Sequence, residues 1–137
     1  MMAKLLLRIA AAIMLVHCVG HTFGQLGWKK DPDPAKHDVI KQMTGPRFPF
    51  MGVSRNMGDY FDGYGYAATI SMLLIVFILW FTSGQVASGA VFARQIILTM
   101  SVCLLFLAVN EFLFFFPAAA ITTLLACICC FWSWYLV

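Results

Sequence analysis

Residues 63–93 read GYGYAATISMLLIVFILWFTSGQVASGAVFA and contain no Asp, Glu, Lys or Arg. Residues 112–137, which read FLFFFPAAAITTLLACICCFWSWYLV, are free of these charges in the same way. A helix rises about 1.5 Å per residue and the hydrocarbon core of a bilayer is about 30 Å thick, so apolar stretches of this length are typical of membrane-spanning helices. These two stretches predict that the chain is a membrane protein.

The composition excludes an ordinary soluble enzyme and a disordered segment. Of the 137 residues, 62% are hydrophobic and 11% are charged, whereas soluble domains average about 45–50% apolar and about 25% charged residues. The formal net charge of +3, from nine Lys and Arg against six Asp and Glu, is too small for a nucleic-acid-binding face. Most of the charges fall within residues 29–62, which therefore read as extramembrane.

The apolar segments predict an all-α membrane protein with four transmembrane helices in an up-down bundle, a single membrane domain over residues 1–137. The first segment carries two histidines and no small-residue cleavage site, so we interpret it as a span rather than a signal peptide. A short linker, residues 84–89, joins the second and third spans. The predicted spans are residues 5–27, 62–83, 92–114 and 117–136.

Residues 28–61 are predicted to form one long loop between the first two spans. The sequence Asp31-Pro32-Asp33-Pro34 is incompatible with a regular helix at its start, whereas residues 35–43 favour one short helix. Several of the later loop residues are too apolar for a loop that extends into water, so we expect the loop to fold back onto the bundle. These residues are Phe48, Phe50, Met51 and Met57.

The first span carries the sharpest polar pattern. At 100° per residue, one face holds His17, Gly20, His21, Gly24 and Trp28. The Gly-x-x-x-Gly spacing predicts close approach of a neighbouring helix. The two histidines are therefore expected to face protein, where they either hydrogen-bond a neighbouring helix or bind a ligand or a proton. Two histidines four residues apart can also bind a metal, but such a site needs a third ligand, so we predict no metal site.

A second group of polar residues lies where the chain enters the second span. Asp59, Asp62, Tyr66 and Thr69 share one helical face. We expect Asp62 to open the helix, because a carboxylate is stabilised at the positive end of the helix dipole. The group is interpreted either as a helix cap at the interface or as the acidic wall of a pocket mouth.

Glu111 is the most suggestive single residue, because ionisable side chains inside spans are costly and are functional candidates by default. It lies about one turn before the end of the third span, next to Asn110. The alternative to a functional role is a structural one, in which the carboxyl group is protonated or reaches toward the interface. In either case His21 or Arg55 is the expected partner. Helix parity places this end of the bundle on the side of the long loop. We therefore predict that His21 and Glu111 share one interior pocket, with Asp59 or Asp62 near its mouth.

The five cysteines all fall in apolar spans, where they behave as small buried hydrophobic residues. The cluster Cys127-x-Cys129-Cys130 lies deep in the fourth span. A zinc site would require four converging ligands, so we interpret the cluster as core packing. The sequence specifies no cofactor.

Two stretches together carry a family resemblance: Gly20-His21-Thr22-Phe23-Gly24, and SRNMGDYFDGYG at residues 54–65. They resemble a group of small bacterial four-helix integral membrane proteins, loosely DoxX-like, over about half of the chain. The resemblance implies a multi-pass protein of the bacterial inner (plasma) membrane with both termini cytoplasmic and the first loop outside. It also implies that a shared motif includes His21, Arg55, Asp59 and Gly63, and it brings no established reaction.

The distribution of Lys and Arg argues for the opposite orientation. Three of them lie on the side of the N-terminus and six on the side of the long loop, and the positive-inside rule would place the loop in the cytoplasm. We follow the resemblance and expect cytoplasmic termini.

Three functions remain open from the sequence. The first is a module that binds or carries an amphipathic small molecule, such as a lipid, a quinone or a sterol-like compound. The second is an accessory subunit of a larger membrane complex, such as a respiratory one, bound to a membrane-protein partner or to further copies of itself. The third is an acid–base membrane enzyme such as an isomerase. The candidate ligand-binding residues are His17, His21, Arg55, Asp59, Asp62, Tyr66, Asn110 and Glu111.

Overall fold

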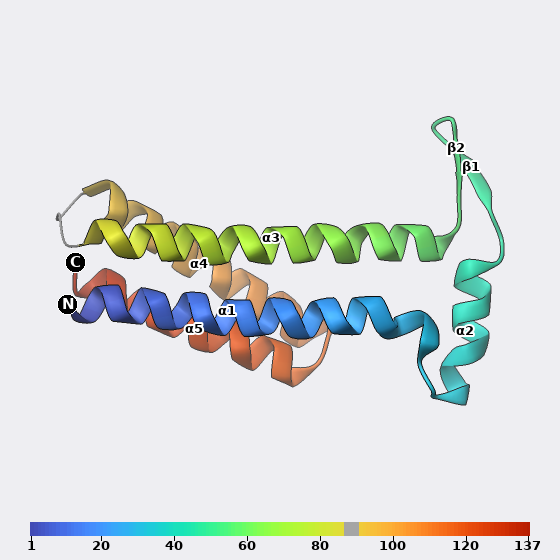
Figure 1. Ribbon diagram of the computed structural model, residues 1–137, viewed down its shortest axis with the longest axis horizontal. Helices are drawn as coiled ribbons and strands as arrows, with labels where there is room; N and C mark the ends of the chain where they lie inside the picture. Colours follow the sequence, from blue (N-terminus) through green and yellow to red (C-terminus); the bar gives the residue numbers. More distant parts are fainter. Residues whose placement is uncertain (87–90) are drawn as a thin grey trace. The chain divides into compact units, whose positions relative to one another are not determined.

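A computed structural model describes residues 1–86 and 91–137 of the chain (Figure 1). In chain order the elements are α1 (Met2–Gly27), a 3-10 turn (Trp28–Lys30), α2 (Pro34–Thr44), β1 (Phe48–Phe50), β2 (Val53–Arg55), α3 (Met57–Gln85), α4 (Val91–Phe114) and α5 (Pro117–Tyr135). Four helices, α1, α3, α4 and α5, are long and apolar enough to cross a membrane. The predicted four-helix membrane fold is confirmed. Residues 87–89 of the predicted linker lie outside the described residues, and α3 continues into the first part of that linker.

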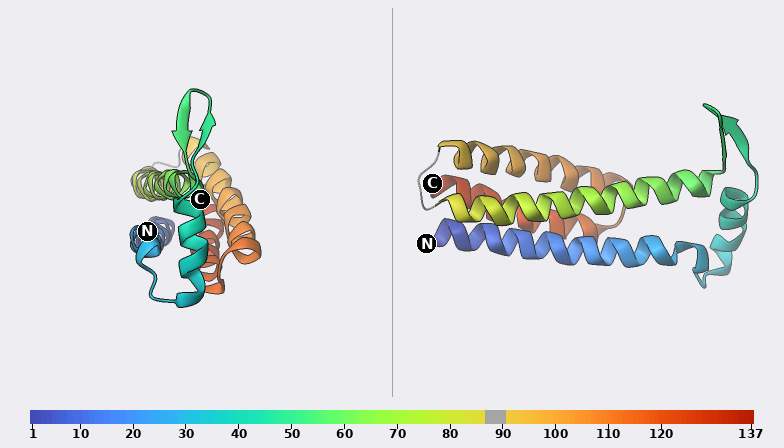
Figure 2. Two further views of the ribbon diagram at one scale, coloured as in Figure 1. Left: turned by 90° about the vertical axis from the view of Figure 1, so that its right-hand side faces the viewer. Right: turned by 45° about the horizontal axis from the view of Figure 1, so that its top comes forward.

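The chain divides into two compact units. The first comprises Met1–Cys18 and Ser71–Val137, and the second comprises Val19–Ile70. The division falls inside α1 and α3, so each of these helices contributes one segment to each unit. In the first unit the segments of α1 and α3 run beside α4 and α5 (Figure 2).

The interior of the first unit is built mainly from small side chains at helical spacing. Small residues let helix backbones approach closely, which favours association where lipid removes most of the hydrophobic driving force between helices. On α1 the buried residues are Ala3, Leu7, Ala10, Ala11, Met14 and Cys18. On α4 they are Ala93, Ile97, Met100, Ser101, Leu104, Ala108 and Glu111. On α5 they are Ala119, Ala120, Thr123, Ala126, Cys127, Cys130 and Ser133.

The close packing of α1 therefore lies elsewhere than the Gly-x-x-x-Gly pattern predicts. Gly20 and Gly24 are exposed, and no atom of the described residues lies within 4 Å of the position that a Cβ would take at either. Within their own unit these two glycines therefore make no close contact with another helix, and close approach of a helix from another chain stays a prediction. The buried stripe of α1 runs through its first half and includes the alanines Ala3, Ala10 and Ala11.

Both ends of the chain meet at one end of the first unit. Ser133 Oγ donates a hydrogen bond of 3.1 Å to the carbonyl of Ala3. Two basic side chains of this unit lie over tryptophan rings, Arg8 over Trp80 at 4.9 Å and Arg94 over Trp134 at 5.3 Å. Arginine stacked on tryptophan suits a membrane interface, where an apolar ring borders water.

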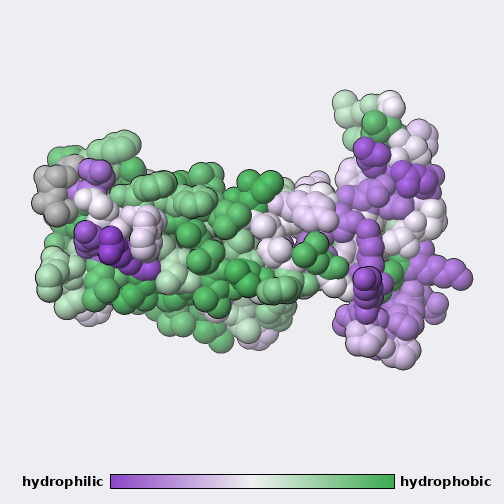
Figure 3. All heavy atoms as spheres, viewed as in Figure 1, coloured by the Kyte–Doolittle hydropathy of each residue, from purple (hydrophilic) through white to green (hydrophobic). Residues whose placement is uncertain are grey.

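Most of the surface of each spanning helix faces outward. Between 28% and 39% of the apolar window of each helix is buried inside the protein. Apolar residues cover most of the visible face of the long helices, apart from a hydrophilic patch at their left-hand end, and hydrophilic residues gather over α2 and the two strands (Figure 3). The outward apolar surface is the one that lipid covers.

In the second unit, α2 confirms the short helix predicted for residues 35–43 and extends it by one residue at each end. Asp33 is its N-cap and accepts a hydrogen bond of 3.0 Å from the amide of Ala35, while Pro34 takes the first helical position. Lys36 pairs with Asp31 at 2.7 Å. The Lys36 ammonium lowers the pKa of the Asp31 carboxyl, and Asp31 raises the pKa of Lys36.

Strands β1 and β2 form an antiparallel hairpin that the sequence did not predict. Phe50 pairs with Val53 across a two-residue turn, in which Met51 has φ 47° and Gly52 has φ 84°. Positive φ at both positions is what the twist of a tight hairpin requires. Three-residue strands are too short to show an alternating pattern, and Pro49 argues against a strand except at a sheet edge.

The apolar side chains of the loop are less covered than predicted. Phe48 and Phe50 contact the ring of Tyr60, with ring centroids 6.0 Å and 6.5 Å away. Nevertheless Phe50 is 55% exposed and Met51 at the hairpin turn is 87% exposed. The hairpin holds these side chains outward because a two-stranded ribbon leaves both of its faces open.

Candidate functional site

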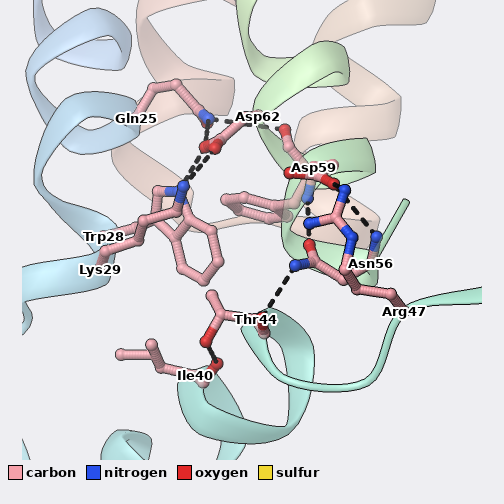
Figure 4. A network of polar contacts seen from close by, with 10 residues as sticks. Gln25, Trp28, Lys29, Ile40, Thr44, Arg47, Asn56, Asp59 and Asp62 are labelled. Atoms are coloured by element: carbon pink, nitrogen blue, oxygen red, sulfur yellow. Dashed lines mark hydrogen bonds and ion pairs between the residues drawn. The ribbon is translucent and has the colours of Figure 1, made fainter. Parts of the chain in front are cut away.

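The entry to α3 is fixed by a reciprocal cap. Asn56 Oδ1 accepts a hydrogen bond of 2.8 Å from the amide of Asp59, and Asp59 Oδ2 accepts one of 3.1 Å from the amide of Asn56. This arrangement satisfies two amides that a helix start otherwise leaves unpaired. Asn56 also donates to the carbonyl of Thr44 at 2.8 Å, and Arg47 Nη2 lies 3.4 Å from Asp59 Oδ2 (Figure 4). The cap interpretation of this region is confirmed, with Asp59 rather than Asp62 in the first turn.

Asp62 instead lies in the second turn of α3 and holds the end of α1. Its Oδ1 accepts hydrogen bonds from Trp28 Nε1 at 2.7 Å and from Gln25 Nε2 at 3.2 Å. Its Oδ2 pairs with the ammonium of Lys29 (Figure 4). The prediction that Asp62 opens the helix is wrong, because α3 begins at Met57, where the cap provided by Asn56 is available.

His21 lies one helical turn before Gln25 in α1 and contacts a hydroxyl of α3. Its Nδ1 lies 3.2 Å from Thr69 Oγ1, and Thr22 Oγ1 lies 3.3 Å from the same hydroxyl. His21 is half-buried, which agrees with the interpretation that it hydrogen-bonds a neighbouring helix. Tyr66, on α3, is 51% exposed.

A hollow of about 290 Å³ lies beside the start of α3. It contains two of the predicted site residues, Arg55 and Asp59, and two tyrosines. The Arg55 guanidinium donates a hydrogen bond of 3.3 Å to the carbonyl of the preceding residue, Ser54. The Arg55 side chain is exposed. The lining residues are Arg55, Asp59, Tyr60, Gly63, Tyr64 and Ala67.

The first unit contains a second polar cluster, formed by α1, α4 and α5. His17 Nε2 lies 3.6 Å from Glu111 Oε1, and the two side chains are 9% and 6% exposed. The other ring nitrogen, Nδ1, lies 3.2 Å from Thr122 Oγ1 and 3.0 Å from Thr123 Oγ1. A buried imidazole therefore links a carboxylate on one side to two hydroxyls on the other.

One oxygen of this cluster is left without a partner. Glu111 Oε2 is buried and has no hydrogen-bond partner among the described residues. Buried polar atoms are rarely left unpaired in native proteins, because each one costs free energy that water would otherwise supply. Asn110, the neighbouring predicted site residue, is exposed and does not join the cluster.

The structure thus brings His17 to Glu111, where the sequence suggested His21 or Arg55 as the partner. The two predicted site carboxylates of the second unit have their own cations, since Arg47 pairs with Asp59 and Lys29 pairs with Asp62. His21 and Glu111 belong to different units, so the single pocket expected to contain both stays a prediction.

Several residues of these clusters were missed from the sequence. Gln25 follows His21 by four residues and precedes Trp28 by three, so the helical spacing that selected the histidines also pointed to it. Thr122 and Thr123 are an adjacent polar pair in a charge-free span, a weaker signal because threonine commonly satisfies its hydroxyl on its own helix. Nothing in the local sequence indicated that Arg47 would reach Asp59.

Comparison with known proteins adds no relative to this picture: no family model, no curated protein and no solved structure matches the chain.

Proposed function

We propose that this membrane protein binds or carries an amphipathic molecule with an anionic head, such as an anionic phospholipid or a fatty acid. The observation that supports this proposal is the hollow of about 290 Å³ at the start of α3, which joins a cation, an acid and two tyrosines. Small-molecule sites are concave and mostly apolar, with a few polar groups that fix orientation. This hollow has that composition.

Charge in the hollow favours an anionic head. Asp59 is already balanced by Arg47 at 3.4 Å. Arg55, by contrast, has no carboxylate within 4.0 Å among the described residues and keeps most of its donors available. A guanidinium presents paired donors that match a phosphate or carboxylate. A quinone or a sterol carries no such charge and would leave Arg55 unused.

The surface of α3 that leads away from Arg55 suits an apolar tail. Tyr64 is 75% exposed and Ile70 is 67% exposed, and Ala67 between them is exposed as well. Residues three apart lie about 60° from each other around a helix, so the exposed apolar path winds from Tyr64 through Ala67 to Ile70 as it leaves the hollow. Tyrosine rings at the polar end are typical of a membrane interface.

Lipid binding is tested with purified, delipidated protein in a mild detergent by native mass spectrometry. We expect dioleoyl phosphatidylglycerol to remain bound and the zwitterionic dioleoyl phosphatidylcholine to be released. Arg55→Gln should weaken retention of the anionic lipid about tenfold, equivalent to about 1.4 kcal/mol. Lys30→Gln removes the same charge from an exposed position outside the hollow and should leave retention unchanged. Equal loss in both variants, or equal retention of both lipids, would contradict the proposal.

The accessory-subunit function has one observation in its favour. At the junction of α4 and α5 a run of large apolar side chains points outward: Phe112, Leu113, Phe114, Phe115 and Phe116 are all between 61% and 75% exposed. Aromatic side chains are enriched where proteins contact one another. The same mass spectra test this alternative, because a subunit would retain another protein at a fixed stoichiometry in place of lipid.

We further propose that the protein resides in a bacterial inner membrane with both termini in the cytoplasm. Four spans place the two termini on one side, and the hydrogen bond between Ser133 and Ala3 is consistent with this arrangement. Reporter fusions that are active on one side only are expected to place Val137 in the cytoplasm and an insertion at Ala35 outside. The same compartment for both sites would refute the four-span topology, and exchanged compartments would refute the orientation alone.

A further inference from the structure

The cluster in the first unit has features that the lipid proposal does not use. Glu111 is 5% exposed, one of its oxygens is unpaired among the described residues, and His17 faces the other oxygen. We propose that His17 and Glu111 together hold one exchangeable proton inside the membrane-spanning part of the protein. This inference is independent of the hollow at the start of α3.

Hydrogen bonding on the far side of the ring constrains where this proton lies. Thr122 Oγ1 lies 3.1 Å from the carbonyl of Ala118 and 2.7 Å from that of Ala119. The single hydroxyl hydrogen of Thr122 is therefore committed to its own helix. Thr122 can then only accept from His17 Nδ1, whereas Thr123 Oγ1, 3.0 Å from the same nitrogen, can accept or donate. When Nδ1 carries the hydrogen, the ring presents the lone pair of Nε2 to the carboxyl group. Two bare lone pairs would repel each other, and a proton on either Nε2 or Glu111 Oε1 removes that repulsion.

The transfer itself balances without any other reactant. As the bond from the proton to Glu111 Oε1 breaks, a bond to His17 Nε2 forms, and the neutral pair becomes a carboxylate beside an imidazolium. The distance of 3.6 Å between these atoms exceeds that of a hydrogen bond, about 3.2 Å at most. The two side chains must therefore approach by roughly half an ångström for the proton to pass.

Other charged groups of the first unit lie far along the helices. Arg8 precedes His17 by nine residues and Arg94 precedes Glu111 by seventeen, which is roughly 14 Å and roughly 25 Å of helix rise. Lys4 lies still closer to the N-terminus, and residues 71–85 of α3 and all of α5 contain no Asp, Glu, Lys, Arg or His. Two other kinds of titratable group are close in sequence. His21 follows His17 by four residues, about 6 Å of helix rise, and its Nδ1 lies 3.2 Å from Thr69 Oγ1. The thiols of Cys18 and Cys127 adjoin the cluster in sequence, and the Cys127 thiol donates to the carbonyl of Ser101 at 3.2 Å.

Burial also favours a proton over a larger ligand. The side chains of His17 and Glu111 are 9% and 6% exposed, and Thr123 is fully buried. A lipid head or a hydrated ion would have to displace packed helices to reach them, whereas a proton needs no volume. Intramembrane chains of acidic and imidazole groups are a recurrent means of moving protons.

The sequence offers a clean probe, because Glu111 is the only glutamate in the chain. In full-length protein reconstituted into lipid bilayers, the ¹³C signal of its side-chain carboxyl carbon and the ¹⁵N signals of the His17 ring are followed across pH. We expect both sets of signals to change with common midpoints, because strongly coupled groups titrate as a pair. In His17→Gln the Glu111 midpoint should move by about one pH unit or more, a tenfold change in proton affinity. His37→Gln, in the exposed helix α2, should leave it unchanged.

Each remaining outcome overturns the proposal. A Glu111 signal that stays constant across pH would show that the site exchanges no proton. A midpoint that is insensitive to His17→Gln, or that responds equally to His21→Gln, would show that His17 is not the partner. The wild-type titration alone decides the matter if His17→Gln fails to fold, since independent midpoints for Glu111 and His17 exclude a shared proton.

Discussion

Ala126→Leu is expected to destabilise the protein by about 3 kcal/mol, because its added side chain has no room inside the first unit. Ala126 is 0% exposed on the face of α5 that also buries Cys127 and Cys130. Extra carbon atoms in such a site force neighbouring helices apart, and the contacts of many side chains are lost together. The effect is measured as the free energy of unfolding in mixed micelles, with helix content followed as denaturing detergent is added.

Ala118→Leu is the matched control, since it makes the same substitution at an exposed position of the same helix. It should change the free energy of unfolding by less than about 0.5 kcal/mol. Gly24→Leu on α1 should be similarly mild, because open space surrounds that glycine. A large loss for Gly24→Leu with a small one for Ala126→Leu would support the Gly-x-x-x-Gly interface and contradict the packing described above.

Gly65→Ala is expected to destabilise the second unit by about 2 kcal/mol, because it displaces a buried, hydrogen-bonded side chain. A Cβ at this position would overlap the side-chain amide of Gln25, which is buried and donates to Asp62. The amide must therefore move, and the Asp62 carboxylate loses one of its donors. Unfolding in mixed micelles, monitored by the fluorescence of Trp28 after the other three tryptophans are replaced by phenylalanine, measures the loss in this unit.

A double-mutant cycle identifies the cause. Gln25→Ala removes the clashing amide, so Gly65→Ala should cost at least about 1 kcal/mol less in that background than alone. Gly63→Ala, two residues earlier on α3 and with open space around it, controls for the effect of a glycine-to-alanine change on the helix itself. Strictly additive losses for Gly65→Ala and Gln25→Ala would show that α1 and α3 do not pack through this contact.

The spans and the short helix α2 were predictable because each depends on local chemistry. Charge-free stretches such as residues 63–85 have to form helices in a membrane, since every backbone amide and carbonyl must be satisfied within its own segment. Asp33 and Pro34 likewise specify the start of α2, the first as its N-cap and the second as its first helical residue. The hairpin was not predictable, because its two strands of three residues depend on the turn at Met51 and Gly52 and carry no pattern of their own.

The candidate site was predicted in its residue types more than in its pairing. Glu111 was selected for its cost inside a span and His17 for its place on the polar face of the first span. The two residues are 94 positions apart, and which imidazole meets the carboxylate depends on the rotation and register of α1 against α4. A change of one turn exchanges His17 for His21, and hydropathy does not distinguish the two. Similarly, the first turn of α3 was misplaced because the cap from Asn56 depends on a reciprocal bond with Asp59 rather than on charge.

The small-residue interior of the first unit has an evolutionary consequence. Where Ala126, Ser101 and Ser133 are fully buried, selection acts on side-chain volume, and hydrophobicity carries little information because the surrounding lipid is as apolar as the interior. Lineages can therefore exchange leucine, phenylalanine and isoleucine freely on the outward faces while those three positions remain limited to alanine, serine, cysteine or glycine. Sequence drift in such a chain erases overall similarity quickly and leaves a sparse record of small residues at helical spacing.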